Sequence, residues 1–522
     1  MEQVQLYDTT LRDGMQGQGM SLSVEEKIRV VHALDDLGVT FIEAGFPGSN
    51  PKEVELFEKL EHEDLKTAVI TSFGMTRRRG VEARDDETLQ LLADTFAPAT
   101  TLVGKTWDLH LEKVTKVSRE ENLEMIAESV RYLTEAGKRV IYDAEHFFDG
   151  FLSDRDYALH CLETAIEAGA ECVTLCDTNG ASLPAAVSEA TSAVADRFAD
   201  SVVVGIHTHN DAECAVADSL AAVDAGARLV QGTVNGIGER TGNANLTSIL
   251  PALQLKMGYE VVTPEQLANL TATAHFVDEL LNRTPDPDQP YVGRNAFAHK
   301  GGMHVAGVRA DARTFEHVEP TTIGNHREAL VSELSGRGTV LEAAEVAGLE
   351  MSDDEAARAL RALKEKEHRG YQYEAADGSF EMLLRRESGE YESLFQVESF
   401  RVLVESRESG GVTTEATIKL LIDGERSLMT AEGNGPVKAL DNALRAALVD
   451  RYPGLANVEL TNYKVRILDE HQGTGAVTRV LIDSTDGKQD WGSIGVSENI
   501  IEASWEALLD SLDYALQEGS GK

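Results

Sequence analysis

Two histidines one residue apart are the first residues of this sequence that could perform chemistry together. They stand in GIHTHND, residues 205–211, which continues the β-branched run SVVV. Such a run is typical of a buried strand, in which alternate side chains share a face. His207 and His209 therefore point the same way, and Thr208 points the other way. The pattern fits a metal site, and it equally fits a pair of hydrogen-bonded core histidines.

The elements that must position these histidines repeat regularly over the first 255 residues. Short apolar runs rich in β-branched residues alternate with amphipathic helical patterns such as SVEEKIRVVHALDDLG and DYALHCLETAIEAGA. Near-continuous apolar strands between helices predict a parallel sheet covered on both faces. Eight such units predict an α/β fold, a (β/α)8 TIM barrel; the alternative is an open doubly wound sheet, although no strand is followed by G-x-G-x-x-G. The predicted strands are 4–9, 39–45, 67–73, 99–105, 139–145, 171–177, 202–209 and 228–236.

Polar residues gather where these strands end. In such a barrel the carboxyl ends of the strands and the loops after them form the mouth of the active site. Strands 1, 2, 5, 6 and 7 are followed or ended by polar groups, and strand 8 runs into the glycine-rich loop NGIGERTGNAN. The candidates are Arg12, Asp13, Glu43, Asp143, Glu145, Asp177, Thr178, His207, His209, Glu239, Arg240 and Asn243.

A buried mouth with several carboxylates and only two arginines needs a further cation. Two imidazoles with a carboxylate and a carboxamide suit Mg²⁺, Mn²⁺ or Zn²⁺, and no cysteine is placed to add a thiolate. This context favours the metal interpretation of His207 and His209. Two structural alternatives stay open, in which Arg12 and Asp13 form a salt bridge that closes the barrel and Glu43 only orients Arg12.

Beyond the barrel the pattern changes twice. We predict a catalytic barrel at 1–258, mostly helical linker subdomains at 259–394 that complete the active site, and an α+β regulatory and dimerisation domain at 395–522. Two segments of the last region, at 424–448 and 487–512, each contain a strand, a glycine-containing turn and a helix. This internal repeat predicts a pseudo-symmetric domain.

Composition narrows the class of protein. The 522 residues include 89 Asp and Glu against 48 Lys and Arg, a formal net charge of −41, which argues against a nucleic-acid partner. Such a surface is found in salt-rich cytoplasm and also in ordinary acidic enzymes. No run of 18 apolar residues and no signal segment is present, so we expect no membrane partner. Four cysteines fit reduced thiols and a cytoplasmic location.

Several motifs together resemble one enzyme family. LYDTTLRDG, CDTNG, GIHTHND and NGIGERTGNAN are similar to the metal-dependent condensing enzymes that include isopropylmalate, homocitrate and citramalate synthases and hydroxymethylglutaryl-CoA lyases. FPGSNPKEVELFEKL, YDAEHFFDGF, PYVGRNAFAHKGGMHV, LVSELSGRG and GVSENIIEASWEALLDS look most like the citramalate synthase branch. The resemblance extends over essentially the whole chain.

The resemblance implies a condensation of acetyl-CoA with pyruvate, followed by hydrolysis to citramalate and CoA, in isoleucine biosynthesis. The resemblance also implies that Asp13, His207 and His209 bind the divalent metal, and that Asn243 is a further ligand or lies next to the ligands. The substrate-binding residues would be Arg12, Gln16, Glu43, Asp143 and Thr178, with Arg12 also stabilising the alkoxide. Either Glu145 or His304 would take the proton, and His304 would reach a neighbouring subunit's site. Relatives carry a tyrosine where this chain has Phe315.

The resemblance also implies regulation. The C-terminal domain of that family binds a branched-chain amino acid, so we expect isoleucine to bind at the turns EGNGP or IGVSEN. We also expect this domain to form a homodimer; dimerisation without a ligand is the alternative. Residues near Phe73, Val103 and Trp107 are expected to set the size of the 2-oxo acid. The alternatives are isopropylmalate or homocitrate synthesis, a C–C lyase, and a non-catalytic metal-bound amino-acid sensor.

Overall fold

The computed structural model describes residues 2–47, 49–299, 302–329, 336–389, 391–406, 411–468 and 475–517. Gly48, two residues of HKGGMH (Lys300 and Gly301) and most of the LVSELSGRG stretch lie outside the described residues. The chain divides into two compact units, Met1–Phe297 with His317–Arg327, and Ala298–Glu316 with Glu328–Lys522.

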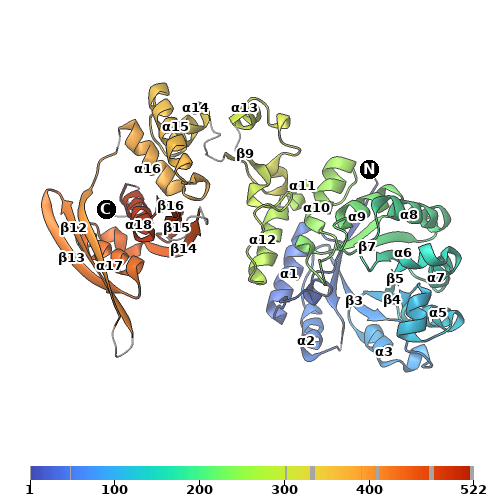
Figure 1. Cartoon of the computed structure of the whole chain (residues 1–522). Coiled ribbons are helices and arrows are strands. Elements are labelled where there is room, and N and C mark those ends of the chain that lie inside the picture. The colour runs from blue at the N-terminus through green and yellow to red at the C-terminus, as the bar shows by residue number, and fades with distance from the viewer. Residues whose placement is uncertain are drawn as a thin grey trace. The chain divides into compact units, whose positions relative to one another are not determined.

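Eight parallel strands in the first unit close into a barrel in chain order, with β8 paired to β1 (Figure 1). The predicted barrel is confirmed and the open sheet is excluded; β8 is shorter than expected because the chain turns into the glycine-rich loop. The strands are β1 (Gln5–Asp8), β2 (Phe41–Gly45), β3 (Val69–Met75), β4 (Ala99–Lys105), β5 (Arg139–Glu145), β6 (Cys172–Asp177), β7 (Val203–Thr208) and β8 (Leu229–Gly232).

Helices alternate with the strands along the chain, as the sequence pattern predicts. Polar side chains cap the start of several of them: Ser23 and Glu26 form a reciprocal capping box at the first helix, which ends at the left-handed Gly38. The helices are α1 (Val24–Leu37), α2 (Pro51–Leu60), α3 (Glu87–Asp94), α4 (Asp108–His110), α5 (Arg119–Glu135), α6 (Phe147–Ser153), α7 (Arg155–Glu167), α8 (Pro184–Phe198), α9 (Ala215–Asp224), α10 (Leu246–Ala252), α11 (Pro264–Leu267) and α12 (Leu270–Leu280).

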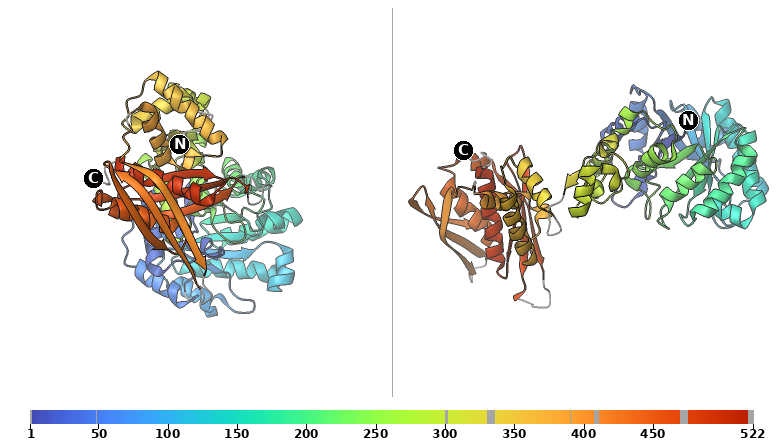
Figure 2. Two further views of the ribbon diagram at one scale, coloured as in Figure 1. Left: turned by 60° about the vertical axis from the view of Figure 1, so that its left-hand side comes forward. Right: turned by 90° about the horizontal axis from the view of Figure 1, so that it is seen from above.

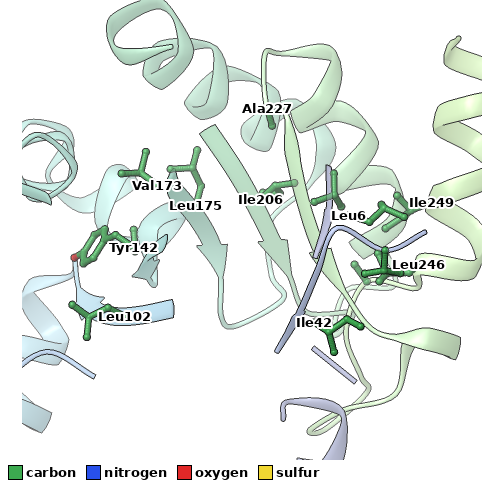
Figure 3. Close-up of a cluster of buried hydrophobic side chains, with 14 of the residues drawn as sticks. Leu6, Ile42, Leu102, Tyr142, Val173, Leu175, Ile206, Ala227, Leu246 and Ile249 are labelled. Atoms are coloured by element: carbon green, nitrogen blue, oxygen red, sulfur yellow. The ribbon is translucent and has the colours of Figure 1, made fainter. Parts of the chain in front are cut away.

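Alternate strand residues divide the barrel into two buried layers. One set, which includes Leu6, Ile42, Tyr142 and Ile206, packs against the helices (Figure 3). The other set fills the interior, where Tyr7, Phe41, Ala99, Ile141, Cys172 and Leu229 form a separate apolar plug. Because side chains alternate, the interior residue of each strand nearest its carboxyl end faces the mouth above this plug.

The second unit contains two antiparallel sheets, each followed by a helix (Figure 2). Strands β11 (Phe395–Ser406), β12 (Val412–Ile422) and β13 (Glu425–Gly433) are covered by α17 (Pro436–Leu448). Strands β14 (Glu459–Ile467), β15 (Thr478–Thr485) and β16 (Asp490–Ser497) are covered by α18 (Ile500–Gln517). The expected pseudo-symmetric α+β domain is confirmed.

Short elements precede these sheets in the second unit: β9 (Ala298–His299), α13 (Gly302–Ala310), β10 (Glu328–Ala329), α14 (Arg337–Val346), α15 (Asp353–His368) and α16 (Asp377–Ser388). The bounds of the three domains proposed from the sequence stay predictions. Within the part of the chain that the structure describes, no helix has both the length and the apolar character needed to cross a membrane.

Candidate active site

A cavity of about 260 Å³ opens at the carboxyl ends of the barrel strands. Its apolar side is formed by Phe73, Met75 and Val103, from β3 and β4. Ten of the candidate residues named from the sequence line it: Arg12, Asp13, Gln16, Asp143, Glu145, Thr178, His207, His209, Glu239 and Arg240.

Asp13, His207 and His209 bring three possible metal ligands together, each on a buried side chain. The Nε2 atoms of the two histidines lie 3.3 Å apart, and Oδ2 of Asp13 lies 3.6 Å from the first and 3.9 Å from the second. Thr208 points the other way and bonds the carbonyl of Ala215 in α9. The expectation that the two imidazoles share a face is therefore met.

A chain of hydrogen bonds fixes the tautomer of His207. Nε2 of Gln231 donates to Oδ1 of Asp143 at 2.8 Å, so the amide oxygen of Gln231 faces Nδ1 of His207 at 2.9 Å. That oxygen can only accept, so Nδ1 carries the proton and the lone pair of Nε2 faces His209 and Asp13. Orientation of a ligating histidine through its other nitrogen is a usual feature of metal sites.

The charge states suit a cation. Burial alone would raise the pKa of Asp13, but Arg12, and then the two histidines, lower it to about 2. Burial, and then the neighbouring His207, lower the pKa of His209 to about 4. Burial also lowers the pKa of His207. At neutral pH the cluster therefore offers one carboxylate and two neutral imidazoles, the forms in which these groups bind metals.

An unpaired buried oxygen beside the cluster fits a metal ion. Oδ1 of Asn243 is buried without a hydrogen-bond partner in the part of the chain described. The amide nitrogen of Asn243 donates to Oδ1 of Asp13 at 3.2 Å, and Asn243 pairs with His209 through an isolated backbone bridge. Gly238 has a φ of +155°, and a Cβ there would lie 2.1 Å from that amide nitrogen. The glycine-rich loop thus holds Asn243 against the cluster.

Arg12 is held on two sides beside the same cluster. Its Nε lies 2.6 Å from Oε2 of Glu43 and its Nη1 lies 3.2 Å from Oδ2 of Asp13, while its guanidinium stacks 3.9 Å above the ring of Phe73. Glu43 is completely buried and also accepts hydrogen bonds from Tyr7 and Thr9. A guanidinium fixed in this way is a preorganised donor for negative charge in the cavity.

Thr178 and Asp143 face the cavity from neighbouring strand ends. The backbone N–H of His146 donates to Oγ1 of Thr178 at 2.9 Å, which leaves the hydroxyl proton free to donate to a ligand. Burial, and then the Glu43 carboxylate, raise the pKa of Asp143 to about 7. The cavity therefore presents donors beside its apolar wall, since Asp143 is the direct partner of Val103 in the strand register.

Glu145 ends β5 and forms an ion pair with Lys105, the last residue of β4. The two residues are direct partners in the strand register, so the pairing follows from the barrel itself. The Lys105 side chain is almost completely buried, whereas 22% of the Glu145 side chain is exposed toward the cavity. A carboxylate held from behind by a buried ammonium is well placed to act on a ligand in front of it.

Some predicted residues lie elsewhere. Glu43 lies behind Arg12, outside the cavity lining, as the sequence alternative anticipated. Asn243 adjoins the cluster without lining the cavity. Asp177 points to the helix side and accepts hydrogen bonds from the backbone of Ser182 and Ala181. His304 belongs to the second unit, where its ring stacks on Phe315 at 4.2 Å.

Three residues of the site were not predicted from the sequence: Gln231, Lys105 and Met75. The signal for Gln231 was a polar residue within the apolar strand RLVQG, and for Lys105 a lysine at a strand end. Met75 lines the cavity with the expected Phe73 and Val103, whereas Trp107 does not.

Three described families match successive parts of the chain. Residues 3–277 match the HMGL-like family, residues 291–370 the homocitrate synthase post-HMGL domain-like family, and residues 374–516 the LeuA allosteric (dimerisation) domain. The chain therefore belongs to the HMGL-like family, and it is a transferase-type condensing enzyme. Enzymes of this kind are metal-dependent.

Within that family, five relatives that are 42–48% identical over at least 98% of this chain are (R)-citramalate synthases. The enzyme of Aquifex aeolicus is 48% identical over 518 residues, covering 99% of this chain and 98% of its own length. The enzyme of Geobacter sulfurreducens is 48% identical over 530 residues and 100% of both chains. A solved hydroxymethylglutaryl-CoA lyase from Pseudomonas aeruginosa is 18% identical, covering 54% of this chain and 94% of its own, with a TM-score of 0.46. The predicted membership of the citramalate synthase branch is confirmed.

Proposed function

We propose that this enzyme condenses acetyl-CoA with pyruvate and uses water to release citramalate and CoA. The observation that carries the proposal is the cavity itself, in which Arg12, a carboxylate–histidine cluster and Glu145 converge, in a chain 48% identical to (R)-citramalate synthases along its whole length. The reaction needs residues that bind the 2-oxo acid and other residues that act on the thioester.

Asp13, His207 and His209 would hold the divalent metal, with the free oxygen of Asn243 beside them. The donor set suits Mn²⁺, Mg²⁺ or Zn²⁺. When bound, the cation supplies Lewis acidity to the ketone and carboxylate of the 2-oxo acid.

The surrounding residues orient the 2-oxo acid. The free hydroxyl proton of Thr178 donates to its carboxylate, and Gln16 contacts it from the loop after β1. Arg12 donates to the ketone oxygen, on which negative charge develops during carbon–carbon bond formation. Glu43 acts through Arg12 and not on the substrate, since it lies behind the guanidinium.

Glu145 takes the proton from the thioester methyl group, and Lys105 fixes its position. The methyl carbon then bonds to the ketone carbon, and water cleaves the thioester. We assign His304, which is exposed in the second unit, to the same site from a neighbouring subunit.

The apolar wall limits the size of the 2-oxo acid. Phe73, Met75 and Val103 project into a cavity of about 260 Å³, and the ring of Phe73 is covered by Arg12. A methyl group fits against this wall more readily than the isopropyl group of 2-oxoisovalerate or the carboxyethyl arm of 2-oxoglutarate. Pyruvate is therefore the proposed substrate.

Regulation and assembly are assigned to the second unit. The turn EGNGP leads into α17 and lines a cavity of about 340 Å³ together with Val437, Leu460 and Tyr463. Backbone N–H groups at a helix start suit a carboxylate, and the apolar residues suit a branched side chain, so isoleucine is the proposed effector. Exposed apolar residues on one face of the β11–β13 sheet, among them Leu403 and Leu428, are the proposed homodimer surface. The four free cysteines support a reducing cytoplasm.

The test is CoA release from acetyl-CoA with Mn²⁺ or Mg²⁺, comparing pyruvate, 2-oxoisovalerate and 2-oxoglutarate, with and without isoleucine. Turnover with pyruvate that isoleucine suppresses supports the substrate and the effector. Preference for 2-oxoisovalerate or 2-oxoglutarate would overturn the assignment of the substrate. Inactivity of the metal-loaded protein with all three acids would overturn the proposed condensation.

A further inference from the structure

A second group of metal-binding side chains lies beside the cavity, on the carboxyl ends of β4 and β5. His110 ends α4, Glu145 ends β5, and His146 precedes α6. One ligand atom from each of the three lies within 4.8 Å of the other two, and the two imidazole centroids are 4.1 Å apart. Neither histidine has a role in the proposed reaction.

Each of the two histidines has a ring nitrogen available for a cation. Nδ1 of His110 is buried without a hydrogen-bond partner in the described structure. Nδ1 of His146 lies 3.0 Å from Oδ2 of Asp149, which also accepts from Asn179 at 3.0 Å. A carboxylate that accepts from Nδ1–H leaves the lone pair of Nε2 free, as it does for metal-binding histidines.

The backbone around His146 maintains this arrangement. His146 adopts the left-handed conformation, with φ at +57°, which is uncommon for a residue with a side chain. Its N–H group bonds Thr178, and its ring packs on His110, which in turn stacks on Trp107 at 5.7 Å. Local strain held by surrounding contacts is typical of functional positions.

We propose that His110, Glu145 and His146 form a second, inhibitory site for zinc. Two imidazoles and one carboxylate are a zinc-type donor set, whereas Mg²⁺ prefers oxygen ligands. In a tetrahedral zinc site the donors lie about 3.3 Å apart, so ligand atoms that already lie within 4.8 Å of one another approach by no more than about 1.5 Å, through small side-chain rotations.

Lys105 makes this site weaker than the first one. Its ammonium holds Oε2 of Glu145, so only Oε1, which has no hydrogen bond among the described residues, is left for zinc. The positive charge of Lys105 also opposes the cation. The first zinc ion therefore binds at Asp13, His207 and His209, and excess zinc binds at the second site.

Inhibition rests on the proposed function, since zinc at this site occupies the carboxylate that takes the proton from acetyl-CoA. Binding itself does not depend on that assignment. The experiment therefore measures binding and turnover separately on the full-length protein.

For binding, chelator-stripped protein is dialysed against zinc chloride and its metal content is measured. We expect two zinc ions per chain in the wild type and one in His110→Ala. His207→Ala, which lacks the first site, should keep one, and the variant with both changes should bind none. His146→Asn, whose new side chain tolerates the left-handed backbone, should also bind one. His160→Ala removes an exposed histidine of α7 and should behave as the wild type.

For turnover, zinc is titrated into Mn²⁺-loaded enzyme. Half-inhibition of His110→Ala should need about tenfold more zinc than the wild type or His160→Ala, with similar activity before zinc is added. A single zinc ion per wild-type chain, or equal binding and inhibition in His110→Ala, would overturn the proposal. Two zinc ions in an enzyme that lacks condensation activity would instead overturn the proposed function and leave the second site standing.

Discussion

Asp13 and Asp218 are two buried carboxylates of the same barrel with opposite electrostatics. Asp13 lies within reach of Arg12, His207 and Asn243, and its pKa is lowered to about 2. Asp218, on α9, has an oxygen without a hydrogen-bond partner, and burial, and then the nearby Asp177, raise its pKa to about 7. Their relative exposures, 4% and 1%, are almost equal.

Burial therefore does not decide what a carboxylate does in this fold. Removing a carboxylate from water raises its pKa, and only a nearby cation or donor reverses the effect. The barrel mouth supplies Arg12 and retains the charge of Asp13, so a metal ion gains a ligand there. On the side of the barrel that faces the helices, burial and Asp177 both oppose the charge of Asp218. Ionisation of Asp218 therefore lowers the stability of the folded protein.

The largest effect is expected from removal of the charge of Asp13 itself. Asp13→Asn keeps the size of the side chain and leaves His207 and His209 without their anionic partner. We expect metal affinity to fall by more than about 100-fold, because loss of a residue that only orients a metal ligand already costs up to about that much. The rate of CoA release should fall with it. Dialysis with metal analysis and turnover at saturating metal measure the two effects. Undiminished metal binding would show that the histidines alone make the site.

Arg12→Lys keeps the positive charge near Asp13 but removes the planar fork that contacts both Glu43 and Asp13. We expect kcat to fall about 10²–10³-fold, the usual cost of a lost donor to a developing oxyanion. Metal affinity should change much less, since the charge remains. A variant with wild-type kcat would remove Arg12 from the chemistry and leave it the structural role of a salt bridge.

Gln231→Leu tests the support of the cluster without touching a ligand. It removes the acceptor for Nδ1 of His207 and the donor to Asp143. We expect metal affinity to fall about 10–100-fold, with turnover partly restored by excess Mn²⁺. Recovery of turnover with excess Mn²⁺ would distinguish this variant from Asp13→Asn, which lacks a ligand. If metal affinity stays at the wild-type value, the orientation of His207 does not depend on Gln231.

The metal ligands could be predicted from the sequence better than the residues that orient the site. His207 and His209 share a face because strands alternate with period two, and Asp13 follows strand 1, so topology alone brings the three together. Gln231 bonds His207 from 24 residues away, and Lys105 bonds Glu145 from 40 residues away. Those pairs depend on strand register, which a single sequence does not specify. The left-handed backbone of His146 depends in turn on its packing against His110 and Trp107.

The smallest effect is expected at Asp218, and it appears as stability. In the folded protein Asp218 holds its proton up to about pH 7, whereas in the unfolded chain it loses the proton near its ordinary pKa of 3.8. The wild type therefore loses stability as pH rises from about 4 to 7, and Asp218→Asn does not. We expect the variant to gain about 1–2 kcal/mol above pH 7 and almost nothing near pH 4. Asp224→Asn, an exposed position on the same helix, is the matched control and should stay within about 0.5 kcal/mol at every pH. Urea unfolding at several pH values measures both variants, and a gain that does not depend on pH would show that the unpaired oxygen, and not the charge, is what destabilises the wild type.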